Sequence, residues 1–543
     1  MLGDPAVEQH DLPHAVLDRE GERRERERVE TEVVEEPMVR LDHGGKLAAA
    51  RHANGGDDRV EERRGTRGGR SDLHGAPLQH EECQRSDRVL DAAPLLAWHG
   101  GTLQTMLPKG PAMSQVAQTL AWLTRPHDLL RRCAEEIGDA FTLDLGKHGL
   151  FVLVSHPDDV RAVFTASPAI AHAGGGNEVL RAVLGPRSLL LLEEDAHLRE
   201  RKLLLPPFHA RHVEGFVTEI AALAEDATSA LEPGSEVVIH DVMARLSLAV
   251  IRRAVFGARH ETPELGDALH AFLADPKFNL GLIGQLREAS EDGPSSWRAF
   301  QGAFQRIDRA VLDAIARART EGSDGILGML LDSRDEDGRP LDDAHLRDQV
   351  VTLVVTGFET TATALAWAFH WVHRDLDLLA RARDEVRGIP TFADPRTLGR
   401  LPLVDGICRE TLRIQPIIPV VARRLHGSLA LRDRTLPSGI TVAPCSYLAQ
   451  RRPDAFPQPD AFRPERFAER EPTPYEYFPF GGGARRCLGM PLALTEMRVV
   501  LATFLARVEL APIDAERVNP IRRSVTIAPS GGARMKVVSR VSR

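Results

Sequence analysis

The residues best suited to chemistry surround Cys487, in the segment Phe480-Gly-Gly-Gly-Ala-Arg-Arg-Cys-Leu-Gly489. Three consecutive glycines allow the backbone to approach a ligand closely, and Gly489 allows amide groups to point toward the sulfur. A helix expected after Cys487 places its positive end near that sulfur and favours the thiolate, an electron-donating ligand for iron. The alternative for a lone cysteine is a small buried hydrophobe, the interpretation we keep for Cys133 and Cys445.

This segment resembles the haem-binding loop of the cytochromes P450, whose pattern is Phe-x-x-Gly-x-Arg-x-Cys-x-Gly, and every fixed position is matched. The resemblance implies that Phe480 shields the proximal face of a haem b. It also implies that Arg485 pairs with a haem propionate and that Cys487 ligates the iron as a thiolate. Gly489 belongs to the same cofactor-binding set.

Further candidates for cofactor binding lie outside the segment around Cys487. His197 and Arg201 are one helical turn apart, so both can reach the same edge of a ligand. In similar sequences these two residues hold the haem propionates, as does an arginine that matches Arg423, although the adjacent Arg424 is an alternative. Taken without the resemblance, His197 is interpreted as a solvated helix residue.

The segment Thr356-Gly-Phe-Glu-Thr-Thr361 interrupts an otherwise apolar helix. A mid-helix glycine costs about 1 kcal/mol, and Thr360 can donate a hydrogen bond to the carbonyl of Thr356 and open a polar notch. The alternative is a packing glycine beside satisfied hydroxyls. With the cysteine loop present, the segment resembles the family's distal groove, in which Glu359 and Thr360 match the catalytic pair that delivers protons during oxygen activation. Thr356 departs from the usual Ala or Gly and narrows the pocket.

A third pattern combines Glu410-Thr-Leu-Arg413 with Phe462-Arg-Pro-Glu-Arg-Phe467 before the cysteine loop. A Glu and an Arg three residues apart on a helix are a common surface pair, individually worth tenths of a kcal/mol. The order of the segments follows the family. The resemblance therefore implies that Glu410, Arg413 and Arg466 form a buried ion cluster that fixes the scaffold of the cysteine loop, and that its role is structural.

The elements that hold these residues are predicted to be mostly helical. The longest begins after Asp342, a plausible N-cap, and runs to about His373, a length of about 48 Å. Apolar spacing predicts other helices and a strand pair. The helices are expected at 126–137, 158–165, 196–205, 213–231, 239–256, 263–273, 297–320 and 403–413 and after Cys487, and the strand pair at 141–154.

Residues 1–105 differ in kind from residues 106–543. They contain no Phe, Ile or Tyr, and such a segment cannot bury enough apolar area to offset its ordering entropy. We expect a disordered extension or an upstream sequence that is not normally translated, and we favour the second, with Met106 as the start. The resemblance covers residues 106–543 and implies one large, mainly α, triangular-prism domain with a small β-sheet region.

Composition excludes several classes of protein. The chain is 43% hydrophobic and 27% charged with a net charge of −9, and no basic run indicates nucleic acid as a partner. The five cysteines lack the spacing of a zinc site. Prolines interrupt the apolar stretch from Leu107 to Leu123, and the first residues lack the apolar core of a secretory signal. We therefore expect a soluble, cytoplasmic monomer without a membrane anchor.

The function implied is monooxygenation, in which one atom of O2 enters a hydrophobic small molecule. The alternatives are a peroxide-dependent or rearranging enzyme of the same fold and a non-enzymatic haem sensor, neither of which needs Glu359 and Thr360. Electrons are expected from a separate ferredoxin and ferredoxin reductase, since no such module follows the cysteine loop. The predicted pocket residues are Thr356, Gly357, Ile418, Val421 and Ile527.

Overall fold

The computed structural model describes residues 106–541 except 175–176, 178–179, 261–263, 265, 269–294, 514–517 and 524. The chain divides into two units, Met1–Ala93 and Pro94–Arg543. All described residues belong to the second unit. The prediction about residues 1–105 therefore lies outside the described residues, as does most of the helix predicted at 263–273.

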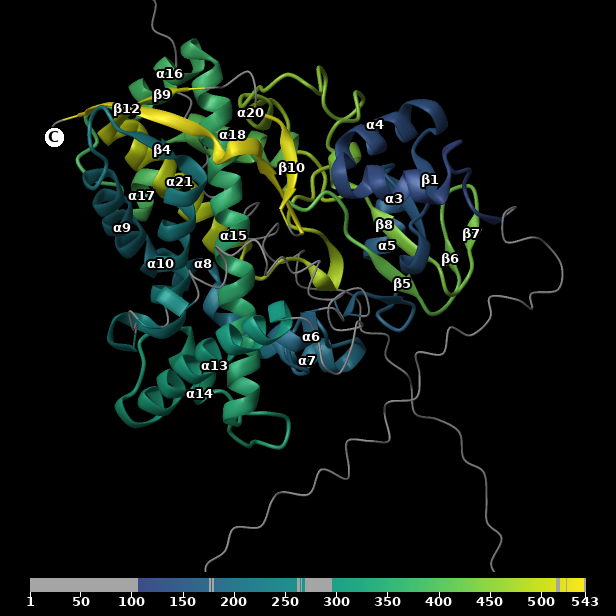
Figure 1. Ribbon diagram of the computed structural model, residues 1–543, viewed down its shortest axis with the longest axis horizontal. Coiled ribbons are helices and arrows are strands. Elements are labelled where there is room, and N and C mark those ends of the chain that lie inside the picture. Colours follow the sequence, from purple (N-terminus) through teal and green to yellow (C-terminus); the bar gives the residue numbers. More distant parts are fainter. Residues whose placement is uncertain are drawn as a thin grey trace, which may run out of the picture. The chain divides into compact units, whose positions relative to one another are not determined.

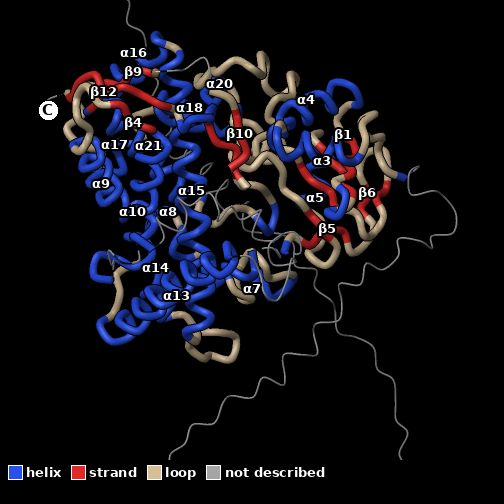
Figure 2. Tube along the Cα trace, in the orientation of Figure 1, coloured by secondary structure: helices blue, strands red, loops and turns tan. Residues whose placement is uncertain are grey.

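The described part of the second unit is mainly helical, as predicted (Figure 2). Its α-helices are α3 (Gln115–Thr124), α4 (Pro126–Ile137), α5 (Pro157–Phe164), α6 (Arg181–Leu184), α7 (Glu194–Leu204), α8 (Ala210–Val213), α9 (Val217–Ser229), α10 (Ile239–His260), α13 (Ser295–Glu321), α14 (Ile326–Asp332), α15 (Asp343–Arg374), α16 (Leu376–Val386), α17 (Pro395–Leu398), α18 (Pro402–Ile414), α19 (Ser446–Ala449), α20 (Arg466–Glu469) and α21 (Met490–Arg507).

The strands form small sheets, of which the largest has the order β1-β2-β8-β5-β3. In it β2 and β8 run parallel and the other neighbours run antiparallel. A second sheet has the order β4-β12-β9, and β6-β7 and β10-β11 are two-stranded. The strands are β1 (Ala140–Asp144), β2 (Leu150–Val154), β3 (Ala171–His172), β4 (Glu236–Val238), β5 (Arg423–Leu425), β6 (Leu429–Ala430), β7 (Thr435–Leu436), β8 (Thr441–Pro444), β9 (Val508–Pro512), β10 (Pro520–Arg523), β11 (Thr526–Pro529) and β12 (Arg534–Arg540).

The long helix α15 organises the core. It begins where predicted, because the Asp342 side chain accepts a hydrogen bond from the backbone N–H of His345 at 2.8 Å. It packs against α10, α13, α18 and α21 (Figure 1). Gly357 allows α10 to approach closely, since a Cβ at that position would lie 3.0 Å from the side chain of Ile251. The packing role considered for this glycine is therefore confirmed.

The same helix is the one described segment long and apolar enough to cross a bilayer, but most of its apolar stretch is buried inside the protein. A core helix of a globular protein has these same properties. The apolar stretch from Leu107 to Leu123 is divided between an irregular segment and α3. The burial of α15 in the core therefore explains its apolar composition.

Most predicted elements are confirmed, with small shifts at their ends. The strand pair at 141–154 is β1 and β2, joined by a turn at Gly146–His148. The helix predicted at 403–413 is α18, and the one after Cys487 is α21. The prediction of one helix at 213–231 is wrong in detail, because short turns precede α9.

Candidate functional site

The loop that carries Cys487 is a tight structure between α20 and α21. The Cys487 N–H donates to the carbonyl of Phe480 at 3.0 Å, so the motif closes on itself. Gly481 and Gly483 have φ of 70° and 63°, a region that favours glycine. A Cβ on Gly483 would lie 2.1 Å from the carbonyl oxygen of Phe164. The glycines are therefore required by the backbone conformation and by close packing on α5.

Cys487 is the exposed member of the described cysteines, whereas Cys133, Cys408 and Cys445 are buried. Desolvation by nearby protein atoms nevertheless raises the pKa of the Cys487 thiol above its usual value. The N–H groups of Gly489 and Met490 and the Arg201 guanidinium lower the pKa without cancelling the increase. The helix end thus acts in the predicted direction but does not favour the thiolate by itself, and a bound metal ion would complete deprotonation.

The predicted propionate-binding residues are brought together from three elements. His197 and Arg201 lie on α7, Arg423 on β5, and Arg485 in the turn Gly483–Arg485. Burial, followed by the positive charges of Arg485, Arg201 and Arg423, lowers the pKa of His197 to about 3. The four side chains therefore lie close together, and the three guanidinium groups make them one cationic group.

His197 is 3% exposed, so its interpretation as a solvated helix residue is wrong. The choice between the two adjacent arginines is also clear in the structure. Arg423 is buried, whereas Arg424 is exposed, because alternate side chains of β5 point to opposite faces of the sheet. Burial and the nearby Arg485 charge lower the pKa of Arg423 to about 10.

One carboxylate, that of Glu193, accompanies this cationic group. It accepts hydrogen bonds from Arg485 Nη2 and from the backbone N–H groups of Ala173, at 3.2 Å, and Gly174. Arg485 Nη2 also donates to the carbonyl of Leu192 at 2.5 Å. Glu193 was not predicted, and its acidic neighbours in the sequence give no signal that separates it from a surface residue.

These residues fit a haem group. Three arginines against the one carboxylate described beside them leave an excess of largely buried positive charge, which the two propionates of a haem would neutralise, while the neutral imidazole of His197 can donate a hydrogen bond. The exposed thiol of Cys487 lies near Arg201 of the same group, as their mutual influence on pKa shows. Among the described residues no cluster of three or more His, Cys, Asp or Glu side chains is arranged to hold a metal ion.

The polar segment of α15 forms an opening in a buried helix. Between positions 348 and 370, the residues that are not buried are Thr356, Gly357, Glu359 and Thr360. The Thr360 hydroxyl donates to the Thr356 carbonyl at 3.0 Å, as predicted, and Thr356 donates to Thr352 at 2.7 Å. The hydroxyls of Thr356 and Thr360 therefore make their hydrogen bonds within the helix. They nevertheless border the partly exposed stretch of α15, whose flanking turns are buried.

Glu359 is held between two other elements. Its Oε1 lies 3.3 Å from Arg523 Nε on β10 and 3.5 Å from His240 Nε2 on α10. Its side chain is 23% exposed, so the carboxylate lies at the edge of the opening rather than in the core. Neither Arg523 nor His240 was predicted, since nothing in the sequence associates residues so far from Glu359.

The predicted pocket residues occupy several segments. The Ile527 N–H donates to the Ile417 carbonyl at 2.9 Å, and its own carbonyl accepts from Trp367 Nε1 at 2.9 Å. The segments that carry Ile418 and Ile527 are therefore joined to α15. Ile418 is 41% exposed and Ile527 is 1% exposed. Val421 lies beside the cysteine loop, because a Cβ on Gly481 would be 3.8 Å from its side chain.

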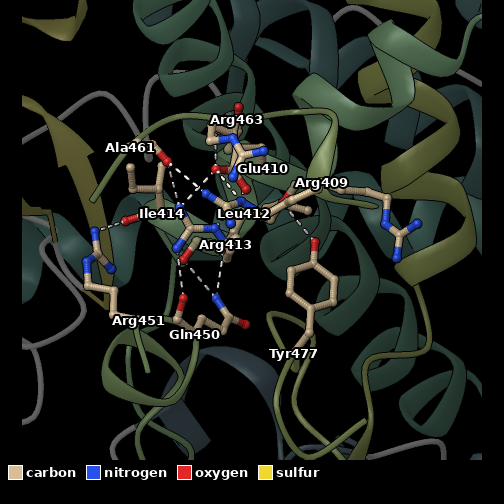
Figure 3. Close-up of polar contacts among 12 residues, drawn as sticks. Arg409, Glu410, Leu412, Arg413, Ile414, Gln450, Arg451, Ala461, Arg463 and Tyr477 are labelled. Atoms are coloured by element: carbon tan, nitrogen blue, oxygen red, sulfur yellow. Dashed lines mark hydrogen bonds and ion pairs between the residues drawn. The ribbon is translucent and has the colours of Figure 1, made fainter. Parts of the chain in front are cut away.

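The predicted ion cluster is present and buried, and Figure 3 shows Glu410 beside Arg413. Arg413 donates to both oxygens of Glu410, at 2.7 and 2.9 Å, and Arg466 donates to Glu410 Oε1 at 3.0 Å. The remaining guanidinium N–H groups are directed to backbone carbonyls, among them those of Gln450 and Ala461. Buried charges with this many partners hold α18 against the segment before the cysteine loop.

Gln450 connects this cluster to the cysteine loop. Its Nε2 donates to the carbonyls of Leu412 and Arg413, each at 3.0 Å, in the last turn of α18 (Figure 3). Its Oε1 accepts from the N–H of Phe478 at 3.0 Å, two residues before Phe480. Phe480 itself is half-buried against the helical core. Gln450 is thus a positioning residue that the sequence analysis missed.

Comparison with known proteins agrees with this fold and site. The family model for cytochrome P450 matches residues 108–536. Putative cytochrome P450 135B1 of Mycobacterium tuberculosis is 34% identical over 450 residues, covering 80% of this chain and 92% of that protein. Putative cytochrome P450 137 of the same species is 31% identical and covers 80% and 91%, respectively. The solved structure of a cyanobacterial CYP120A1 with bound retinoic acid has a TM-score of 0.70 at 22% identity, covering 80% of this chain and all of that one.

The chain belongs to the cytochrome P450 family. It is accordingly an oxidoreductase of the monooxygenase type, and its fold is the mainly α fold of that family. Family membership implies haem with cysteine thiolate ligation, O2, an organic substrate and a source of electrons.

Proposed function

We propose that this cytochrome P450 oxidises a hydrophobic small molecule, with Cys487 as the axial ligand of a haem b. His197, Arg201, Arg423 and Arg485 would hold the propionates. The bound haem supplies the activation of O2, so that one oxygen atom enters the substrate and the other leaves as water. The observation that carries the proposal is the buried cationic group beside an exposed cysteine, which matches an anionic, iron-bearing cofactor.

Glu359 and Thr360 are proposed to supply protons during turnover. Both border the one opening in the buried stretch of α15, and the carboxylate can exchange a proton that the neighbouring hydroxyl passes on. A peroxide-dependent or rearranging enzyme and a haem sensor have no need for this pair. The pair therefore favours oxygen activation with external electrons.

The substrate proposed is apolar. Ile418, Val421 and Ile527 are brought to the vicinity of α15 and the cysteine loop, and Gly357 adds no side chain. Thr356 adds a hydroxyl and a methyl group at the opening, so we expect a substrate more slender than an Ala or Gly there would admit. A spectral binding screen with fatty acids, terpenoids and polyketides tests this proposal.

The electron donor is proposed to be a ferredoxin with its reductase in the cytoplasm. Arg486 is exposed next to Cys487, and Arg201 lies near the same sulfur. Positive charge at this position suits an acidic electron-transfer partner. Turnover with a ferredoxin that falls steeply as ionic strength rises would support this arrangement.

The decisive experiment is Thr360→Ala. The variant should retain haem, thiolate ligation and substrate binding, because none of these requires the hydroxyl. Product formed per reductant consumed should fall, with the reductant diverted to hydrogen peroxide. General acid–base steps contribute roughly 10²- to 10⁴-fold, so a partial effect is measurable.

The matched control is Thr361→Ala. Thr361 makes the same type of bond, from Oγ1 to the Gly357 carbonyl at 3.0 Å, but its residue is 4% exposed. This variant should preserve the ratio of product to reductant. Full coupling in Thr360→Ala, or equal losses in both variants, would show that Thr360 has no special role in proton delivery.

A further inference from the structure

A buried histidine on α10 lies behind Glu359. His240 is 1% exposed, and its Nε2 lies 3.2 Å from Thr363 Oγ1 and 3.5 Å from Glu359 Oε1. Thr363 and Glu359 are four residues apart on α15 and therefore lie on one face of that helix. One ring nitrogen of His240 thus faces both a hydroxyl and the carboxylate proposed to deliver protons.

The opposite ring nitrogen lies near a carboxylate whose side chain is exposed. His240 Nδ1 lies 3.8 Å from Asp241 Oδ1, and the Asp241 side chain is 57% exposed. Neither His240 Nδ1 nor Glu359 Oε1, both buried, makes a hydrogen bond to any described residue. Buried polar atoms normally make hydrogen bonds, so two such atoms without a hydrogen bond at a functional site call for an explanation. A group that exchanges protons in both directions provides one.

Arg523 completes the surroundings of the carboxylate. Its Nε lies 3.3 Å from Glu359 Oε1, and its side chain is 44% exposed. An arginine does not release its proton in proteins, so Arg523 can hold the Glu359 carboxylate in place but cannot supply it with protons. Of the two nitrogen-bearing neighbours of Glu359, His240 is the one able to do so, because an imidazole can both accept and release a proton.

We propose that His240 is a relay residue that carries protons from Asp241 to Glu359. The exposed carboxylate of Asp241 takes up a proton from solvent and passes it to His240 Nδ1, and the Nε2–H proton of the imidazole passes to Glu359 Oε1. One proton enters the ring and one leaves, and a flip of the ring restores the starting tautomer. This inference rests on the proposed role of Glu359 and Thr360 and extends it to the surface.

The simplest alternative is that His240 only anchors Thr363. Two variants separate the roles. His240→Gln retains a donor that can reach Thr363 Oγ1 but cannot pass on a proton. Thr363→Val removes the hydroxyl and leaves His240 facing Glu359. Thr363→Val therefore tests the anchoring role of this contact directly.

The experiment uses the haem-loaded full chain, a substrate from the binding screen and a surrogate electron donor. We expect His240→Gln to lower product per reductant by about tenfold, less than a group acting directly on the reaction, and to increase the solvent deuterium isotope effect. Thr363→Val should leave both near those of the parent protein. Parent-like coupling in His240→Gln, or equal losses in both variants, would overturn the relay.

A second readout does not depend on turnover. The ring nitrogen signals of His240, in histidine-¹⁵N-labelled protein with ferrous haem and carbon monoxide, can be assigned by their loss in His240→Gln. Glu359→Gln should shift the Nε2 signal, and an unchanged signal would show that the contact is absent and overturn the relay. If Thr360→Ala and Glu359→Gln both keep full coupling, the proposed function of the pair fails. If these two variants lose coupling and His240→Gln does not, the relay alone fails.

Discussion

The pKa of the Cys487 thiol is shifted in opposite directions by the backbone of its own motif and by the rest of the protein. The backbone amides of the motif lower the pKa of its thiol, whereas the surrounding protein raises it more strongly. Ligation to a metal ion is therefore what would make the thiolate persist at neutral pH. The exposed position of the sulfur, rather than a low pKa of the thiol, therefore suits Cys487 to bind a metal ion.

We expect Cys487→Ala to abolish the red-shifted Soret band of the ferrous carbon monoxide complex, because no other described cysteine is exposed. Absorption spectroscopy of purified protein with added haem is the measurement. Cys445→Ala, which removes a buried thiol, should keep the band. A band of normal position and intensity in Cys487→Ala would disprove the assignment of the axial ligand.

Glu496 is a buried carboxyl in α21 that the proposed mechanism does not use. Burial raises its pKa to about 7, and a hydrogen bond from Ser247 on α10 opposes this rise. Because the folded pKa lies above the unfolded one, the neutral form stabilises the fold at low pH. This stabilisation is fully present below the unfolded pKa and is lost as pH rises through about 7.

Glu496→Gln should remove that pH dependence while keeping an acceptor for Ser247. Relative to the parent protein, its free energy of unfolding should rise progressively from about pH 4.5 and level off above pH 7, by about 3 kcal/mol, since one pKa unit corresponds to about 1.4 kcal/mol. Urea unfolding at several pH values checks this. Parallel stability curves for the two proteins would mean that Glu496 does not titrate abnormally.

At the scale of elements, α18 positions the cysteine loop through hydrogen bonds of side chains, although the two segments are not adjacent in the chain. Glu410 neutralises Arg413 and Arg466, and Gln450 joins the end of α18 to Phe478. The predicted structural role of the cluster agrees with these contacts. Gln450 extends that role to within two residues of Phe480.

Glu410→Gln should destabilise the fold by about 3–5 kcal/mol, because it leaves two buried guanidinium groups without their anion. Urea unfolding and haem retention on gel filtration are the measurements. Glu136→Gln is the control, since the Glu136 and Arg132 side chains form an exposed pair on α4, and it should leave stability unchanged. Similar unfolding midpoints for the two variants would contradict the buried role of Glu410.

At the scale of the whole molecule, the described structure and the family match cover nearly the same residues. The described residues begin at Met106, and the cytochrome P450 match begins at residue 108. Leu107 already contributes to the core beside the largest sheet. The part of the chain that resembles the family therefore contains its own core.

We expect a chain that starts at Met106 to fold and to bind haem as well as the full chain does. The hydrogen bonds and ion pairs described above for the candidate site join residues that follow Met106. Thermal unfolding and haem content, measured side by side on the two proteins, check this expectation. A large loss of haem or of melting temperature in the shorter chain would assign a structural role to residues 1–105.

The sequence by itself determined the features that depend on neighbours along the chain. The spacing of Phe480, Arg485 and Cys487, the N-cap of α15 and the helix of the Glu410–Arg413 pair are local patterns, so they could be predicted. The notch at Thr360 is local too, because its hydroxyl bonds within one helical turn.

The tertiary structure decided which residues far apart in the chain meet. Strand alternation places Arg423 and Arg424 on opposite faces, but only the packing of β5 selects Arg423 for the interior. The contacts of Glu193 with Arg485 and of Glu359 with His240 join residues more than 100 positions apart. Such pairs leave no periodicity or spacing in the sequence, because their proximity results from the packing of whole elements against one another.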